Sequence, residues 1–228
     1  MTDLHTHILH GIDDGAAALG DSVVLLKAEI DSGVHTVALT PHFYPDKMSI
    51  AEFLKKRDKA VNELKIATDR LSLPIRFILG AEVAYSPALL QLELDSLCYK
   101  DTKILLIELP PGGFPALAPD VLFKLQMQGY TPMLAHIERY SYFEKSPELI
   151  TQLVHGGSLT QVTAGALCGN MGIRRRMLKL IANDLVHAIA TDAHSFRPPM
   201  LSKAKAIVEK KLGKETAEKL VNFEWIAK

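Results

Sequence analysis

Short apolar runs alternate with amphipathic stretches along the whole chain, and this alternation predicts the order of its elements. Runs of Val, Ile and Leu are typical of buried strands, whereas apolar residues spaced three and four apart are typical of helices. The predicted strands are 2–7, 34–40, 75–83, 103–109, 131–136, 158–163 and 185–191. The predicted helices are 20–33, 49–71, 119–128, 147–155, 174–183 and 202–221. Seven strands alternating with helices indicate an α/β fold with a parallel sheet or a closed barrel.

Length and composition narrow the class of protein. The 228 residues suffice for one large α/β domain, and we expect a single domain over residues 1–228. Lysine plus arginine equals aspartate plus glutamate at 26 each, which argues against a nucleic-acid or membrane-surface partner bound through overall charge. Two cysteines are too few for a disulfide framework, and no signal peptide or membrane span is evident. We therefore expect a cytoplasmic protein that does not insert into a membrane.

Histidines and carboxylates gather where the predicted strands end. The residues at these carboxyl ends are His7, His42, Glu82, Glu108, His136 and Asp192. In the first strand Asp3, His5 and His7 alternate with other residues and so share one face. Active sites of β/α barrels form at the carboxyl ends of the strands, and imidazole with carboxylate suits a divalent transition metal. The sequence thus predicts a metal site at the barrel mouth.

The same residues carry a family resemblance. The pattern Asp-x-His-x-His, followed by His, Glu, His and Asp-x-His at later strand ends, resembles the polymerase and histidinol phosphatase (PHP) superfamily. Within it, several motifs resemble the bacterial capsule-type protein-tyrosine phosphatases of the CpsB/YwqE type. These motifs are Gly11-Ile12-Asp13-Asp14-Gly15-Ala16, Thr40-Pro41-His42, Gly80-Ala81-Glu82-Val83, Ile107-Glu108-Leu109, His136-Ile137-Glu138-Arg139-Tyr140, Asp192-Ala193-His194 and Arg197-Pro198-Pro199. They cover nearly the whole chain in order.

The resemblance implies a distorted, TIM-like (β/α)7 barrel, the PHP fold, that holds three metal ions, commonly Mn²⁺. By this likeness the first metal is held by His5, His7, Glu82 and Asp192. Glu82 also bridges to the second, held with Glu108 and His136, and the third is held by Asp14, His42 and His194. Asp13 is adjacent to Asp14 and could take its place. Arg139 and Arg197 match the phosphate-binding arginines of the family. Iron, zinc and magnesium are the other metals that such ligands accept.

The implied activity is hydrolysis of phosphotyrosine by a metal-bridging hydroxide. Two metals about 4 Å apart can generate a nucleophile from water and neutralise phosphoryl oxygens. The substrate we expect is a phosphotyrosine protein, most plausibly the tail of a bacterial tyrosine kinase that controls capsular or exopolysaccharide synthesis. In this sequence His10 stands where the family usually has proline, and the loop from His194 to Arg197 is short.

Other functions stay open at this point. One is a PHP phosphatase for a small phosphomonoester such as histidinol phosphate, and another is a non-catalytic metal-binding regulatory module. Cys168 and Arg174 also fit the Cys-x5-Arg loop of cysteine-dependent phosphatases, although Leu167 precedes the cysteine and no Ser or Thr follows the arginine.

Several further side chains have both a functional and a structural interpretation. Phe43, Tyr44 and Phe114 follow ligand-bearing strands and could flank an aromatic phosphoester, or could pack beneath the loops. The run 174–176 of three arginines is either a solvated helix face or a docking point for a phosphorylated tail.

Overall fold

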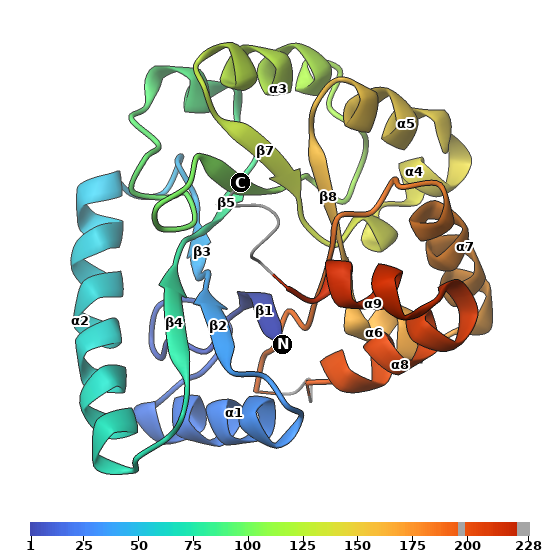
Figure 1. Cartoon of the computed structure of the whole chain (residues 1–228). Coiled ribbons are helices and arrows are strands. Elements are labelled where there is room, and N and C mark those ends of the chain that lie inside the picture. The colour runs from blue at the N-terminus through green and yellow to red at the C-terminus, as the bar shows by residue number, and fades with distance from the viewer. Residues whose placement is uncertain (196–198, 223–228) are drawn as a thin grey trace.

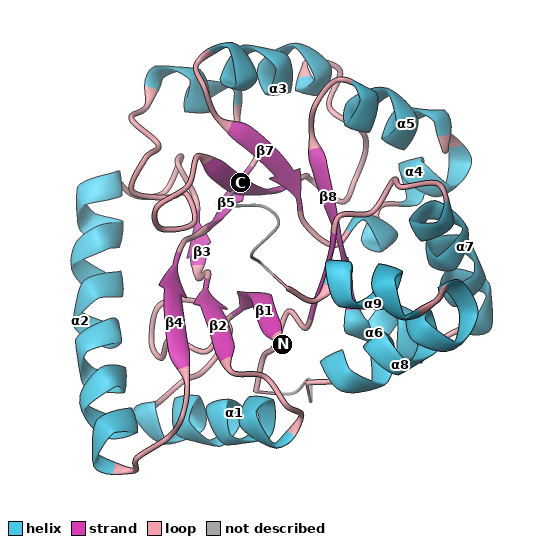
Figure 2. Cartoon of the chain, in the orientation of Figure 1, coloured by secondary structure: helices cyan, strands magenta, loops and turns pink. Residues whose placement is uncertain are grey.

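Parallel strands run through the centre of the molecule and helices surround them (Figures 1 and 2). The structure, a computed structural model, describes residues 1–195 and 199–222. The strands are β1 (Thr2–Thr6), β2 (Thr36–Leu39), β3 (His42–Phe43), β4 (Arg76–Leu79), β5 (Glu82–Ala84), β6 (Ile104–Glu108), β7 (Thr131–Leu134), β8 (Leu159–Thr163) and β9 (Ala188–Ala190). The helices are α1 (Leu19–Asp31), α2 (Ile50–Arg70), α3 (Ala118–Met127), α4 (Ser141–Lys145), α5 (Glu148–His155), α6 (Ala164–Cys168), α7 (Met171–Ala182), α8 (Leu201–Leu212) and α9 (Lys214–Leu220), with 3-10 turns at Pro87–Gln91 and Ile137–Arg139.

The strands form a curled parallel wall in two sections. One section has the order β1-β2-β4 and the other the order β3-β5-β6-β7-β8-β9. The first and last strands meet, because His7 N donates to the carbonyl of Ala193 at 2.9 Å and Asp192 N donates to that of His5 at 2.8 Å. This arrangement is the predicted distorted TIM-like barrel, with strand ends gathered at one mouth.

The two sections meet where two predicted strands bend. Within the predicted strand 34–40 the structure has β2. After Thr40 and Pro41 the chain forms a second short strand, β3, beyond the predicted range. The predicted strand 75–83 likewise breaks between β4 and β5, at Gly80. Proline lacks the N–H that a ladder needs, and a Cβ on Gly80 would lie 3.2 Å from the ring of Tyr99. The buried guanidinium of Arg57 donates to the carbonyl of Gly80 at 3.1 Å and so ties α2 to this break.

The helices follow the predicted pattern with a few differences. Helix α2 begins as predicted at Ser49, whose hydroxyl accepts from Glu52 N at 3.3 Å while its own N–H donates to the Glu52 carboxylate at 3.0 Å. The predicted helix 202–221 is two helices, α8 and α9, because Gly213 between them has φ 98°. Short helices such as α4 and α6 were not predicted, since five residues carry too little periodicity to detect.

Apolar side chains fill the space between the strands and the outer helices, and two acidic residues are buried with them. Asp3 on β1 and Glu29 on α1 are both fully buried. Asp3 accepts from Thr191 N at 3.0 Å, and Glu29 accepts from the hydroxyl of Thr191 at 3.1 Å. Among the described residues, no helix is long and apolar enough to cross a membrane.

Candidate metal centre

Four candidate ligand atoms, from β1 and the residue that follows it, from β5 and from the segment after β9, converge at the barrel mouth. Nε2 of His5 and Nε2 of His7 lie 3.1 Å apart, and each lies 3.1 Å from Oε2 of Glu82. Oδ1 of Asp192 completes the group at 3.6 Å from His5 and 3.3 Å from His7. Ligands about 2.1 Å from one metal ion are separated from each other by about 3.0–3.4 Å. The spacing of these four atoms therefore fits a single ion.

Glu82 faces two groups of ligands at once. Its Oε2 points to His5 and His7, while its Oε1 lies 2.7 Å from Nε2 of His136. Glu108 stands beyond, with Oε1 at 3.7 Å from the same nitrogen of His136. A carboxylate shared in this way can bridge two ions, which is the role that the family resemblance implies for Glu82.

A third group lies nearer the surface. Oδ1 of Asp14 is 3.5 Å from Nε2 of His194 and 3.7 Å from Nε2 of His42. The other nitrogen of His42, Nδ1, is 3.2 Å from Glu82 and 3.7 Å from Glu108. His42 therefore stands between the second and third groups, and the ring of His7 stacks on that of His194 at 4.2 Å.

The adjacent aspartates Asp13 and Asp14 have different surroundings. Asp13 Oδ2 accepts from Nδ1 of His7 at 2.7 Å and from the backbone N–H of His42 at 2.9 Å. Asp13 is thereby occupied on the far side of the His7 ring, where it leaves Nε2 of that ring free for a metal. Asp14 is 68% exposed and turns its carboxylate to His42 and His194. This geometry favours Asp14 as a ligand and Asp13 as the residue that orients His7.

Buried atoms without hydrogen-bond partners support the same interpretation. Among the described residues, Glu82 Oε2, His42 Nδ1 and His136 Nδ1 are buried and make no hydrogen bond. Oε2 of Glu82 faces three imidazole nitrogens at 3.1–3.2 Å, those of His5, His7 and His42. Buried polar groups are normally satisfied, so lone pairs that converge in this way fit metal ligands.

The electrostatics of the cluster follow from this crowding. Burial alone would lower the pKa of His5 and His7, but the nearby carboxylates raise both, for His7 well above the ordinary value. Burial would raise the pKa of Glu82, but the charge of His5 and the hydrogen bond to His136 hold it well below its ordinary value. The pKa of Asp192 is lowered in the same way by His7, His5 and Arg139, against the effect of its burial. The carboxylates of Glu82 and Asp192 are thus kept ionised and available to a cation.

Gln161 on β8 is a member of the site that the sequence did not single out. Its Oε1 accepts from Nδ1 of His5 at 3.1 Å and from the backbone N–H of His136 at 3.0 Å. It is fully buried. The only signal in the sequence was a polar residue in the middle of an otherwise buried strand.

Two of the candidate ligands have an unusual backbone conformation. His136 has φ 32° and Asp192 has φ 52°, the left-handed region that non-glycine residues seldom adopt. Each lies two residues beyond the end of a strand, His136 after β7 and Asp192 after β9.

Arg139 lies beside the first group. Its guanidinium pairs with Oδ2 of Asp192, while Oδ1 of the same carboxylate faces His5 and His7. The nearby Glu138 does not form an ion pair with Arg139. Its carboxylate instead accepts a hydrogen bond from the backbone N–H of Thr163 at 3.2 Å. Arg197 lies outside the described residues.

Comparison with known proteins decides the family. Residues 1–224 match the family described as capsular polysaccharide synthesis, CpsB/CapC. The chain belongs to the CpsB/CapC family. CapC of Staphylococcus aureus is 33% identical over 89% of this chain and 81% of its own length. The tyrosine-protein phosphatase CpsB of Streptococcus pneumoniae is 32% identical over 96% of this chain and 94% of its own.

Solved structures agree with this CpsB/CapC membership. One, reported with YwqE from Bacillus subtilis and CpsB from S. pneumoniae as metal-dependent tyrosine phosphatases, superposes with a TM-score of 0.88 at 29% identity. The superposition covers 96% of this chain and 90% of the chain in that structure. The histidinol phosphate phosphatase of Lactococcus lactis superposes with a TM-score of 0.57 at 13% identity, over 92% of each chain, and shares the fold.

The Cys-x5-Arg pattern is not a phosphate loop in this CpsB/CapC chain. Arg174 turns its guanidinium to backbone carbonyls, those of Leu167 at 2.5 Å and Cys168 at 2.9 Å. Burial raises the pKa of the Cys168 thiol, which opposes the thiolate that such chemistry needs. Arg176 pairs with Glu144 at 2.7 Å. Arg174 and Arg176 therefore have structural contacts instead of facing a ligand.

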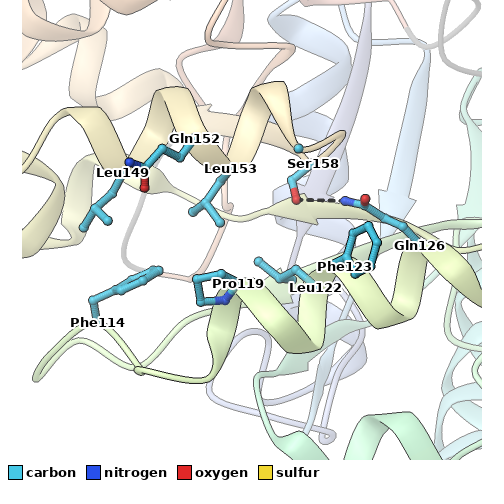
Figure 3. A pocket seen from close by; sticks show the side chains of 10 residues that line it. Phe114, Pro119, Leu122, Phe123, Gln126, Leu149, Gln152, Leu153 and Ser158 are labelled. Atoms are coloured by element: carbon cyan, nitrogen blue, oxygen red, sulfur yellow. Dashed lines mark hydrogen bonds between the residues drawn. The ribbon is translucent and has the colours of Figure 1, made fainter.

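The three aromatic residues that could flank an aromatic phosphoester also differ in their surroundings. Phe43 is fully buried, with its ring 5.2 Å from that of Phe53. Phe114 packs on Tyr142 at 5.5 Å and lines a small apolar hollow between α3 and α5, of about 140 Å³ (Figure 3). No ionisable side chain lines that hollow, so it offers no chemistry. Only Tyr44 lies at the centre, where its ring stacks on His42 at 5.2 Å.

Proposed function

We propose that this chain is a metal-dependent protein-tyrosine phosphatase with a three-ion centre, of which manganese is the favoured metal. The observation that carries the proposal is the placement of Glu82, whose two oxygens face separate groups of ligands. Two relatives at 30% and 32% identity that are named tyrosine-protein phosphatases support the activity.

We assign the ligands to three ions as the groups suggest. The first ion would be held by His5, His7, Glu82 and Asp192, and the second by Glu82, Glu108 and His136. The third would be held by Asp14, His42 and His194. Bound divalent ions would supply the Lewis acidity that makes a nucleophile from water at neutral pH. Metal analysis distinguishes manganese from iron, zinc and magnesium.

The side chains around the ions have roles of their own. Glu82, fixed by its contacts to His5 and His136, would set the separation of two ions. Arg139 would leave Asp192 for the phosphoryl oxygens, which its planar fork can bind in pairs. Arg197 would act with it. The leaving phenol of tyrosine has a pKa of about 10, so it departs without a strong general acid.

The family description points to the biological substrate. Because the family belongs to capsular polysaccharide synthesis, we propose a bacterial tyrosine kinase controlling capsular or exopolysaccharide synthesis as the phosphotyrosine partner. We place the reaction in the cytoplasm, where the free thiols of Cys98 and Cys168 would stay reduced.

The decisive experiment measures hydrolysis of a phosphotyrosine peptide before and after chelation. Chelated protein should be inactive and should recover with Mn²⁺, and His136→Ala should lose activity while it keeps the fold. Histidinol phosphate assayed alongside tests the small-molecule alternative, since a higher kcat/KM on it would overturn phosphotyrosine as the substrate. Metal-loaded protein inactive on both would instead be a regulatory module. Activity that survives chelation but not a thiol reagent would contradict the metal mechanism.

A further inference from the structure

A band of lysines begins at the metal centre and continues along the outside of the barrel. The ring of Tyr44 stacks on the candidate ligand His42 at 5.2 Å, with an interplanar angle of 30°. Lys47 then places its ammonium group 4.1 Å from the centroid of the Tyr44 ring. The turn that carries Lys47 is closed by its own N–H, which donates to the carbonyl of Tyr44 at 3.0 Å. The ring of Tyr44 thus lies between the ammonium group of Lys47 and the candidate ligand His42.

Two hollows extend this band along α2, which lies at the left of Figure 1 beside β4. The first, of about 420 Å³, is lined by Lys47, Met48, Glu52, Lys55, Lys56 and Lys59. The second, of about 300 Å³, shares Lys56 and Lys59 with the first and is bordered by the 10–12 segment. That segment is followed in the chain by Asp13 and Asp14. We call the two hollows together the lysine trough.

The carboxylates in the trough are already engaged. Glu52 accepts from the backbone N–H of Ser49 at the start of α2, at 3.0 Å. Glu63 lies 2.8 Å from Nε2 of His10 and 4.0 Å from the ammonium of Lys59. In the part of the chain that the structure describes, Lys47, Lys55 and Lys56 form no ion pair with a carboxylate. The four lysines of the trough outnumber its two glutamates, Glu52 and Glu63, so its net charge is positive.

We propose that the lysine trough binds acidic residues that flank the phosphotyrosine of a protein substrate. The proposal rests on the proposed function, since a phosphate held at the metal centre fixes where the substrate polypeptide must cross the rim. A peptide that leaves over Tyr44 passes Lys47 and meets the first turns of α2. Lys55 and Lys59 are about 6 Å apart along the helix axis, a length that two extended peptide residues span. Aspartate and glutamate in the flank would then pair with successive lysines.

Charge reversal in the trough tests the proposal. We would measure binding of two peptides that carry a phosphonomethyl-phenylalanine in place of phosphotyrosine and differ only in three flanking Glu or Gln residues. Fluorescence anisotropy of the manganese-loaded protein should show the Glu peptide bound about tenfold more tightly at low salt. The preference should shrink as salt is raised, because charges at such a surface are screened. In the double variant Lys55→Glu, Lys56→Glu the preference should vanish or reverse.

The matched control is Lys65→Glu, Lys124→Glu, which changes the net charge equally at two exposed lysines that line neither hollow. It should keep most of the preference for the Glu peptide. Equal binding of the two peptides by the wild type, or equal loss of preference in both double variants, would overturn the trough. Because binding is read without turnover, failure to hydrolyse the corresponding phosphotyrosine peptides would count against the proposed function alone.

Discussion

Oε1 of Gln161 lies 3.1 Å from Nδ1 of His5 and, as an acceptor, requires that nitrogen to carry the proton. The tautomer so fixed leaves the lone pair of His5 on Nε2, the nitrogen that faces His7, Glu82 and Asp192. The same oxygen holds the backbone N–H of His136 at 3.0 Å. One buried amide thus positions two of the proposed ligands.

Replacing this amide should weaken metal binding without removing a ligand. We expect Gln161→Leu to lower the affinity for Mn²⁺ by about 10–100-fold, the usual effect of losing a group that orients a metal-bound histidine. Gln161→Glu, which keeps an acceptor for His5, should bind closer to wild type. Calorimetric titration with Mn²⁺ makes the comparison. Wild-type affinity in the leucine variant would show that His5 needs no such support.

Asp13 and Asp14 should differ in the number of ions that the protein retains. Asp14→Ala removes a proposed ligand, so it should lose one manganese equivalent per chain. Asp13→Asn should keep all three ions at saturating manganese but bind them about 10–100-fold more weakly, because it perturbs the hydrogen bond that orients His7. Metal analysis after equilibrium dialysis against saturating Mn²⁺ distinguishes the two. The reverse outcome would make Asp13 the ligand.

Arg139 should contribute to chemistry and not to metal retention. Arg139→Ala should keep its ions while kcat/KM on a phosphotyrosine peptide falls by more than about a hundredfold, as for loss of one charge-stabilising donor worth about 3–4 kcal/mol. Arg139→Lys keeps the charge but not the fork, and should recover part of that loss. A decrease below threefold in the alanine variant would leave only the ion pair with Asp192. In that case the role of Arg139 would be limited to pairing with the buried carboxylate of Asp192.

Glu29 should make the protein less stable as pH rises. Burial and the charge of Asp3 raise the pKa of Glu29 to about 10, so the folded protein keeps a proton that the unfolded chain loses near pH 4.5. The native state therefore binds more protons between these values, and its free energy of unfolding decreases with pH by at most about 1.4 kcal/mol per unit from this group.

The variant Glu29→Gln carries no titrating group at this position and should flatten that slope. Urea unfolding at pH 6 and pH 9 measures the difference, with wild type and variant compared at each pH. The variant should gain stability relative to wild type at the higher pH. Parallel slopes in the two proteins would mean that Glu29 is ionised in the folded state.

Local patterns predicted the alternation of strands and helices and the polar residues at the strand ends, and the family resemblance implied the barrel. Strands are recognised by their apolar runs, and His7, His42 and Glu82 are recognisable because each follows one. The break at Gly80 was not predictable, since it depends on the ring of Tyr99 packing against it from another part of the chain. Gln161 was missed for the same reason. Its partners, His5 and His136, are 156 and 25 residues away, and no local pattern connects them.

The left-handed backbone at His136 and Asp192 has a consequence for how this sequence can change over evolutionary time. Such a conformation disfavours a side chain by about 1–2 kcal/mol, a penalty that glycine does not carry. At these two positions, natural selection must act against substitution by glycine, even though glycine would increase the stability of the folded protein. In a lineage whose substrate has disappeared, that opposing pressure is lifted. Glycine or asparagine should then appear at positions 136 and 192 before the buried core begins to diverge, and would record the loss of chemistry in an otherwise intact barrel.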